Sequence, residues 1–165
     1  MLSRHFFVIC VLSASVGVAY PQPSAVGQYK DWKVFTDQIG GETLCYAATP
    51  ATDKAPRSAQ HGDVWFYVSS SRSGKARSQP SLKVGYQLRP DLPGKAKVGR
   101  SSYTLYGVGD EAFAEDRDDP KLVSALRRGS ELRVEATSKR NTRVSYHFSL
   151  SGSAAAIDSA VATCR

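Results

Sequence analysis

The sequence has few of the groups on which most catalytic sites depend. Its 165 residues include three histidines, three cysteines and one methionine. Histidine is the most common general base in enzymes, and only His61 and His147 lie beyond the N-terminal segment. Neither the GxSxG elbow of serine hydrolases nor the phosphate-binding GxxxxGKS/T loop occurs. We therefore expect no catalytic residue. A hydrolase whose serine, histidine and acid meet from distant positions remains an alternative.

Patterns typical of metal sites are equally scarce. Six acidic residues fall between positions 110 and 119: Asp110, Glu111, Glu115, Asp116, Asp118 and Asp119. An EF-hand calcium loop that began at Asp116 would need glycine at its sixth position, which is Lys121. Carboxylates at positions 118 and 119 are explained more simply by their favourable interaction with the N-terminus of a following helix. We expect no metal ligand and no cofactor.

Only one long apolar run is present, and it lies near the N-terminus. It extends from Phe6 to Ala19, follows the cation Arg4 and ends in small residues. This layout is typical of a secretory signal peptide, and the run is shorter than the ~20 residues of a membrane-spanning helix. We interpret residues 1–19 as a signal peptide, with an uncleaved anchor as the alternative. Residues 20–30 are then a flexible lead-in and residues 31–165 one domain. The expected location is the periplasm, and this interpretation leaves room for outer-membrane association or secretion.

Removal of the leader would leave two cysteines, Cys45 and Cys164. An even pair in an exported protein usually forms a disulfide. The alternatives are a catalytic thiol and a metal ligand, but neither cysteine has a CxxC partner, and Cys164 is the penultimate residue. We therefore predict a disulfide between Cys45 and Cys164.

Short segments with alternating apolar and polar residues dominate the domain, which is typical of β-strands. The strands are expected within residues 32–37, 43–48, 64–68, 82–88, 95–98, 103–106, 111–114, 132–136 and 144–150. The stretch 64–68 is apolar on both faces, so we expect it to be a central, well-covered strand. Segments 49–62 and 69–81 are expected to be loops.

Two segments have helical patterns. Residues 119–128 begin with Asp119 as a cap and Pro120 at the first helical position, and Gly129 follows them. Residues 153–163 are rich in alanine and lead to Cys164. Together with the strands, these helices predict an all-β sandwich with two short helices.

The charge is predominantly positive, with a formal net charge of +7, and this favours anionic partners. Two basic loops could bind sulfate or phosphate groups through charge-assisted hydrogen bonds. The candidate anion-binding residues are Arg72, Lys75 and Arg77 in one loop, and Lys139, Arg140 and Arg143 in the other. Neither loop contains the interleaved aromatic residues that stack on single-stranded nucleic acid, so no nucleic-acid partner is expected.

The ordered motifs of the chain resemble those of the invasion-associated locus B family, exported proteins of Gram-negative α-proteobacteria. They begin with Asp31-Trp32-Lys33-Val34 and Cys45-Tyr46-Ala47-Ala48 and continue with Gly62-Asp63, Asp118-Asp119 and the helix up to Gly129. The terminal hairpin and the alanine-rich helix that ends in Cys164 complete the series. The chain departs from the family pattern at Ser153, where an aromatic residue is common.

The resemblance implies an immunoglobulin-like β-sandwich, a periplasmic or outer-membrane-associated location and a cysteine pair that joins an early strand to the last helix. The family's name implies a part in entry into host cells, but no reaction or ligand is agreed for it. Our leading hypothesis is a non-enzymatic envelope protein that binds a macromolecular or anionic envelope or host-surface partner. The alternatives are a periplasmic structural or stress-response factor with no host role and an uncharacterised hydrolase.

Overall fold

The computed structural model describes residues 22–165, which form one antiparallel sheet of eleven strands and two helices. The order of strands in the sheet is β1-β2-β3-β5-β6-β9-β8-β7-β10-β11-β4. The strands are β1 (Ser24–Tyr29), β2 (Trp32–Ile39), β3 (Glu42–Pro50), β4 (Asp53–Ala55), β5 (Trp65–Ser71), β6 (Gln79–Lys83), β7 (Gly94–Val98), β8 (Ser101–Val108), β9 (Glu111–Phe113), β10 (Glu131–Thr137) and β11 (Arg143–Ser149). The helices are α1 (Asp119–Arg128) and α2 (Ser153–Thr163).

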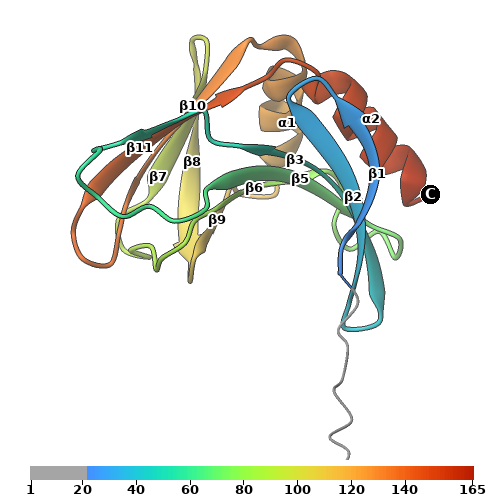
Figure 1. Cartoon of the computed structure of the whole chain (residues 1–165), viewed down its shortest axis with the longest axis horizontal. Helices are drawn as coiled ribbons and strands as arrows, with labels where there is room; N and C mark the ends of the chain where they lie inside the picture. The colour runs from blue at the N-terminus through green and yellow to red at the C-terminus, as the bar shows by residue number, and fades with distance from the viewer. Residues whose placement is uncertain (1–21) are drawn as a thin grey trace, which may run out of the picture.

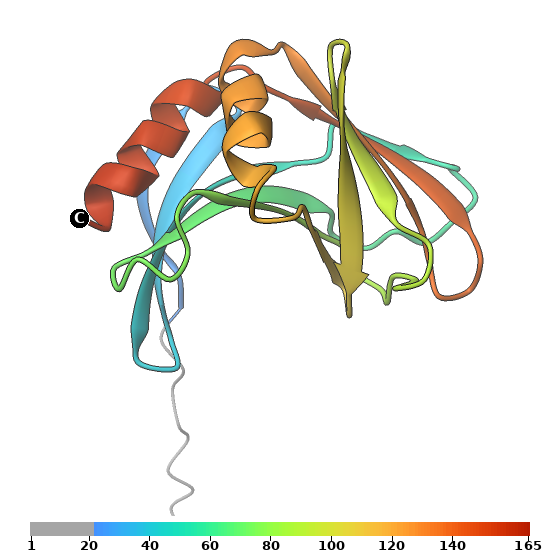
Figure 2. The ribbon, with the colours of Figure 1, turned by 180° about the vertical axis from the view of Figure 1, so that it is seen from behind.

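The sheet bends sharply along its width, so that its two halves face each other (Figures 1 and 2). Strand β8 joins the halves because it pairs with β7 in one and with β9 in the other. The prediction of an all-β sandwich with two helices is confirmed. Its two layers are parts of one continuous sheet, and α2 packs on β1, β2, β3 and β5.

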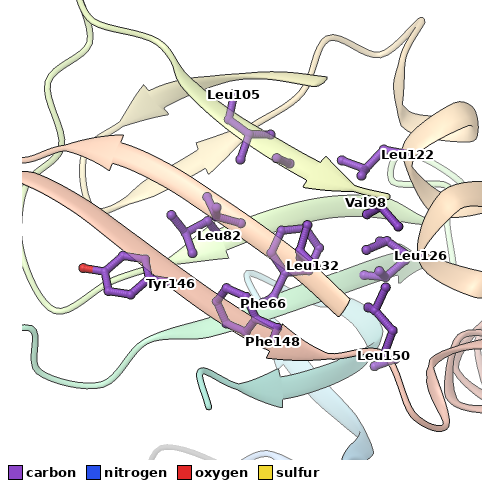
Figure 3. Packing of buried hydrophobic residues seen from close by; sticks show 14 of the residues in the cluster. Phe66, Leu82, Val98, Leu105, Leu122, Leu126, Leu132, Tyr146, Phe148 and Leu150 are labelled. Carbon is purple, nitrogen blue, oxygen red and sulfur yellow. The ribbon is translucent and has the colours of Figure 1, made fainter. Parts of the chain in front are cut away.

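The core lies between the two halves of the sheet and is closed on one side by α1 (Figure 3). Phe66 and Leu82 come from the first half, Leu132 and Phe148 from the second, and Leu126 from α1, and all five are fully buried. Each such side chain contributes about 1.5–3 kcal/mol through its removal from water. The alternation predicted for β10 and β11 is confirmed, since their pairing in register places Leu132 opposite Phe148.

Several local predictions are wrong. Segment 69–81 is not wholly a loop, because β5 extends to Ser71 and β6 begins at Gln79. Residues 20–30 are not wholly a flexible lead-in, because Ser24–Tyr29 form β1, which pairs with β2 through a register shift between Ala25 and Gly27. Segment 49–62 is not wholly a loop, because β3 extends to Pro50 and β4 forms within it, against β11. The strand expected over 82–88 ends at Lys83, although Leu88 still bridges Ser138. The proposed signal peptide lies outside the described residues.

Both helices have the predicted bounds, but the cap of α1 differs from the expectation. Asp118 occupies the N-cap position without a side-chain capping bond, and Asp119 is buried in the first turn. Helix α2 follows Gly152, whose φ of +91° lies in the left-handed region. A Cβ atom at this position would overlap the carbonyl of Tyr29, so glycine allows α2 to start close against β1.

The predicted disulfide is present, and it fixes α2 to the sheet. Cys45 lies on the buried face of β3 and Cys164 at the end of α2, with 5.7 Å between their Cα atoms. Neither helix has the length and apolar character that a membrane crossing would require in the part of the chain that the structure describes.

Candidate functional site

One face of the first half of the sheet carries a group of aromatic side chains that remain partly exposed. They are Phe35 on β2, Tyr46 on β3, Trp65 and Tyr67 on β5, and Phe113 on β9. Successive residues of a strand point to opposite faces, so these residues occupy the face opposite to buried neighbours such as Phe66. We call these five residues the aromatic face.

Strand register brings the members of the aromatic face into contact. Phe35 lies opposite Tyr46, and their rings stack with centroids 5.4 Å apart. Tyr46 then meets Tyr67 edge to face at 5.5 Å, and Tyr67 lies 6.4 Å from Trp65. On the far side, Phe113 pairs with Tyr106, which is 40% exposed. Four of the rings thus form a contiguous group across β2, β3 and β5, and Phe113 lies on the same face beyond Ser81 of β6.

The aromatic face is open because the helices pack on the other side of the sheet. Helix α2 contacts β1, β2, β3 and β5, and α1 contacts β6 and α2. In Figure 1 both helices lie above β3 and β5. Aromatic residues with apolar bodies and polar ends are frequent in protein interfaces, which makes this surface a candidate site.

The charges that raise the pKa of the two tyrosines are carboxylates, although the whole chain is basic. Burial raises the pKa of Tyr46 to about 12, and the negative charge of Asp37 adds to the effect. Burial also raises the pKa of Tyr67, with further contributions from Glu111 and Asp63. Both phenols are therefore neutral hydroxyls at physiological pH, in a locally acidic surrounding.

One lysine of this surface is already paired with carboxylates. Lys83 lies 2.9 Å from Asp110 and 3.4 Å from Glu111. Its hydrogen bond to Asp110 holds the pKa of that carboxyl below its ordinary value. Lys33, on β2, is exposed on the same face, opposite Ala48 of β3. The surface thus combines aromatic rings with carboxylates and one open ammonium group.

The two predicted basic loops lie at opposite ends of the molecule and do not form a common patch (Figures 1 and 2). Arg72, Lys75 and Arg77 lie between β5 and β6, near the C-terminus. Lys139 and Arg140 form part of the turn between β10 and β11, and Arg143 begins β11. Lys139 and Arg140 line a hollow in the surface, whereas Arg143 borders a different depression.

The two histidines considered for a hydrolase lie apart from each other and have other partners. His61 is buried, and its ring nitrogens lie 3.0 Å from the Tyr146 hydroxyl and 2.9 Å from the Pro56 carbonyl. His147, on the outer face of β11, lies 3.1 Å from Glu131. His147 thus has a carboxylate partner, but within residues 22–165 neither ring is hydrogen-bonded to a serine, so neither has both partners of a catalytic triad. Among residues 22–165, no group of three or more His, Cys, Asp or Glu side chains is placed to hold a metal ion.

The aromatic face was not identified from the sequence. The stretch 64–68 was expected to be covered on both faces, but Trp65 and Tyr67 are partly exposed. The available signal was the placement of tyrosine, tryptophan and phenylalanine at the alternate strand positions that usually carry polar, outward-facing residues. Phe35, between Lys33 and Asp37, shows this most clearly.

The fold is that of a disulfide-linked β-protein with partly exposed aromatic side chains on one face of its sheet. Comparison with known families gives a specific result: the model of the Invasion associated locus B (IalB) protein family matches residues 32–161. The chain belongs to this family. No curated protein and no solved structure matches the chain.

Proposed function

We propose that this protein is a non-enzymatic, exported component of the cell envelope that acts by binding a protein partner through its aromatic face. The single observation that carries the proposal is the clustering of five aromatic side chains on a sheet surface that the helices leave open. Exposed apolar patches on a folded domain usually mark interaction sites, so a binding role is the usual explanation.

Charge indicates the chemistry of the partner. Asp37 acts on Tyr46, and Asp63 and Glu111 act on Tyr67. Glu111 is already paired with Lys83, whereas neither Asp37 nor Asp63 takes part in an ion pair among residues 22–165. A protein segment with arginine or lysine side chains would meet these carboxylates and could place its cations over the aromatic rings. Tyrosine, tryptophan and arginine are also the residues that dominate binding energy at protein interfaces.

Family membership and the surroundings of the histidines support the non-enzymatic part of the proposal. The family is not a known enzyme family. The ring of His61 is held by Tyr146 and the Pro56 carbonyl in a structural role. The location we propose is the periplasm. A host-surface partner would indicate a role in host association, and an envelope partner would indicate a periplasmic structural or stress-response factor.

Site-specific photocross-linking in cells that produce the full chain tests the proposal. A photoreactive phenylalanine at Trp65 should capture a discrete protein, whereas the same group at Arg100, on the exposed β7–β8 turn, should not. The captured protein is then purified and titrated against the double variant Trp65→Ala, Tyr67→Ala. We expect a loss of affinity of about 30-fold, since interface residues of this kind contribute 2 kcal/mol or more.

Two controls complete this experiment. Asp63→Asn should weaken binding and reduce its dependence on salt, because a carboxylate is removed from the contact. Arg100→Ala should leave the affinity unchanged. Equal capture at positions 65 and 100, or unchanged affinity of the double variant, would contradict the proposal.

A further inference from the structure

A hollow of about 590 Å³ lies beside the turn between β10 and β11. Its walls come from residues 59–61, 85–87, 138–140, 142 and 144, which are distant in sequence, and none of the five residues of the aromatic face lines it. The volume is within the range of small-molecule sites in proteins. Its lining combines apolar surface from Tyr86 and Val144 with the cations Lys139 and Arg140.

Two of the lining residues, His61 and Gly85, lie where two loops cross closely. A Cβ atom on Gly85 would lie 3.1 Å from both the Cα of Gly62 and the carbonyl oxygen of His61. Gly62 itself has a φ of +63°, which favours glycine. The two glycines allow the loops to pass close together, and the side chain of His61 is buried beneath them.

A chain of hydrogen bonds orients the side chains of His61, Tyr146 and Tyr86 at this crossing. The Pro56 carbonyl can only accept, so Nε2–H of His61 donates to it at 2.9 Å. In the neutral ring, Nδ1 then accepts from the Tyr146 hydroxyl at 3.0 Å, and the Tyr146 oxygen accepts from Tyr86. Burial raises the pKa of both Tyr86 and Tyr146, so these hydroxyls add no negative charge to the wall.

The turn that carries the two cations is held in place. The amide of Lys139 donates to the Gln87 carbonyl at 2.8 Å, and the Ser138 amide donates to the Thr142 carbonyl at 2.9 Å. Arg89 donates to the side chain of Asn141 at 2.8 Å. Within residues 22–165, the lining of the hollow contains no carboxylate, and neither Lys139 nor Arg140 takes part in an ion pair.

We propose that this hollow binds a small organic phosphate or sulfate ester. The oxyanion would be bound by Lys139 and Arg140 through charge-assisted hydrogen bonds, and its organic body would pack on Tyr86 and Val144. Two adjacent cations beside an apolar wall with no opposing carboxylate fit such a ligand better than a metal ion or a cationic group.

The other basic loop provides a contrast within the same molecule. The cations of both loops are exposed, but a carboxylate lies in the Arg72–Arg77 loop, where Glu42 accepts a hydrogen bond from the Ser73 amide at 3.0 Å. Non-specific attraction would bring anions to both loops, whereas a specific binding site would bind them at the hollow alone.

Titration of the disulfide-linked protein with phenyl phosphate, followed by amide chemical shifts in NMR spectra, tests the proposal. We expect the largest shifts in residues 85–87 and 138–142. Inorganic phosphate should bind at least fivefold more weakly than phenyl phosphate, because it lacks a body to pack on Tyr86. The variant Lys139→Gln, Arg140→Gln should raise the Kd at least tenfold, and the matched variant Arg72→Gln, Lys75→Gln should leave it within twofold of the original.

The source of the ester is determined by a second arm, cosedimentation with vesicles that contain phosphatidic acid. Sedimentation that depends on Lys139 and Arg140 would identify a lipid headgroup, and phenyl phosphate binding without sedimentation would identify a soluble ester. Equal shifts at both basic loops, or equal affinities for inorganic and phenyl phosphate, would overturn the proposal. The variant Trp65→Ala, Tyr67→Ala should retain phosphate binding, so failure of the proposed function and failure of this site are distinguishable.

Discussion

Replacing Asp119 with asparagine should stabilise the protein at neutral pH. The side chain of Asp119 is only 8% exposed, and within residues 22–165 its Oδ1 atom has no hydrogen-bond partner. Burial raises its pKa from 3.8 to about 6, and the charges of Asp116 and Asp118 add to the shift. At 1.36 kcal/mol per pKa unit, this shift corresponds to a cost of up to about 3 kcal/mol for the ionised carboxylate.

The direction of the pH dependence follows from the number of protons bound in the folded and unfolded states. Between pH 4 and pH 6 the folded protein keeps the proton of Asp119, whereas the unfolded chain has lost it, because the folded pKa is the higher one. The contribution of Asp119 to stability therefore falls as the pH rises through this window, and it is constant above about pH 7. Asparagine cannot ionise, so the variant is not destabilised by a buried charge at this position.

Urea unfolding at intervals from pH 4 to pH 8, with the disulfide intact, measures the effect. The stability of Asp119→Asn relative to the original protein should increase with pH by up to about 3 kcal/mol. Asp118→Asn is the matched control. Because Lys121 holds the pKa of Asp118 below its ordinary value, the stability of this variant relative to the original protein should not change with pH above about pH 4.5. A pH-independent difference for Asp119→Asn would refute the reasoning.

Two further predictions concern the attachment of α2. The double variant Cys45→Ala, Cys164→Ala should lose about 4–5 kcal/mol of unfolding free energy in urea, because the disulfide closes a loop of 119 residues; a loss below 1 kcal/mol would contradict this. Gly152→Ala should lower the melting temperature by several degrees, because its Cβ would overlap the Tyr29 carbonyl and its φ of +91° is unfavourable for alanine. An unchanged melting temperature would show that β1 can move away at no cost.

Elements with strong local signals could be predicted from the sequence. The bounds of both helices follow from Pro120, Gly129 and the alanine-rich segment, and the β10–β11 hairpin follows from clear alternation. The Cys45–Cys164 disulfide follows from the count of cysteines beyond the apolar N-terminal run. In each case the deciding interactions are close in sequence, or only one pairing is available.

Features that depend on distant partners could not be predicted in this way. Strands β1 and β4 are edge strands whose residues are mostly polar or small, so only pairing with β2 and β11 defines them. Trp65 and Tyr67 lie in a strand that is apolar on both faces, and such a pattern predicts cover on both sides. Only the packing of the helices shows which face stays open. The hollow likewise requires the crossing of loops at Gly62 and Gly85.

Oxidative footprinting of Trp65 and Tyr67 in intact cell envelopes and in the purified protein tests the central claim most directly. Both side chains should react in the purified protein and be protected in the envelope. Tyr103, on the other half of the sheet, should react equally in both samples and serves as the internal control. Equal reactivity of Trp65 and Tyr67 in envelope and purified protein would contradict the claim that this surface is bound by a partner.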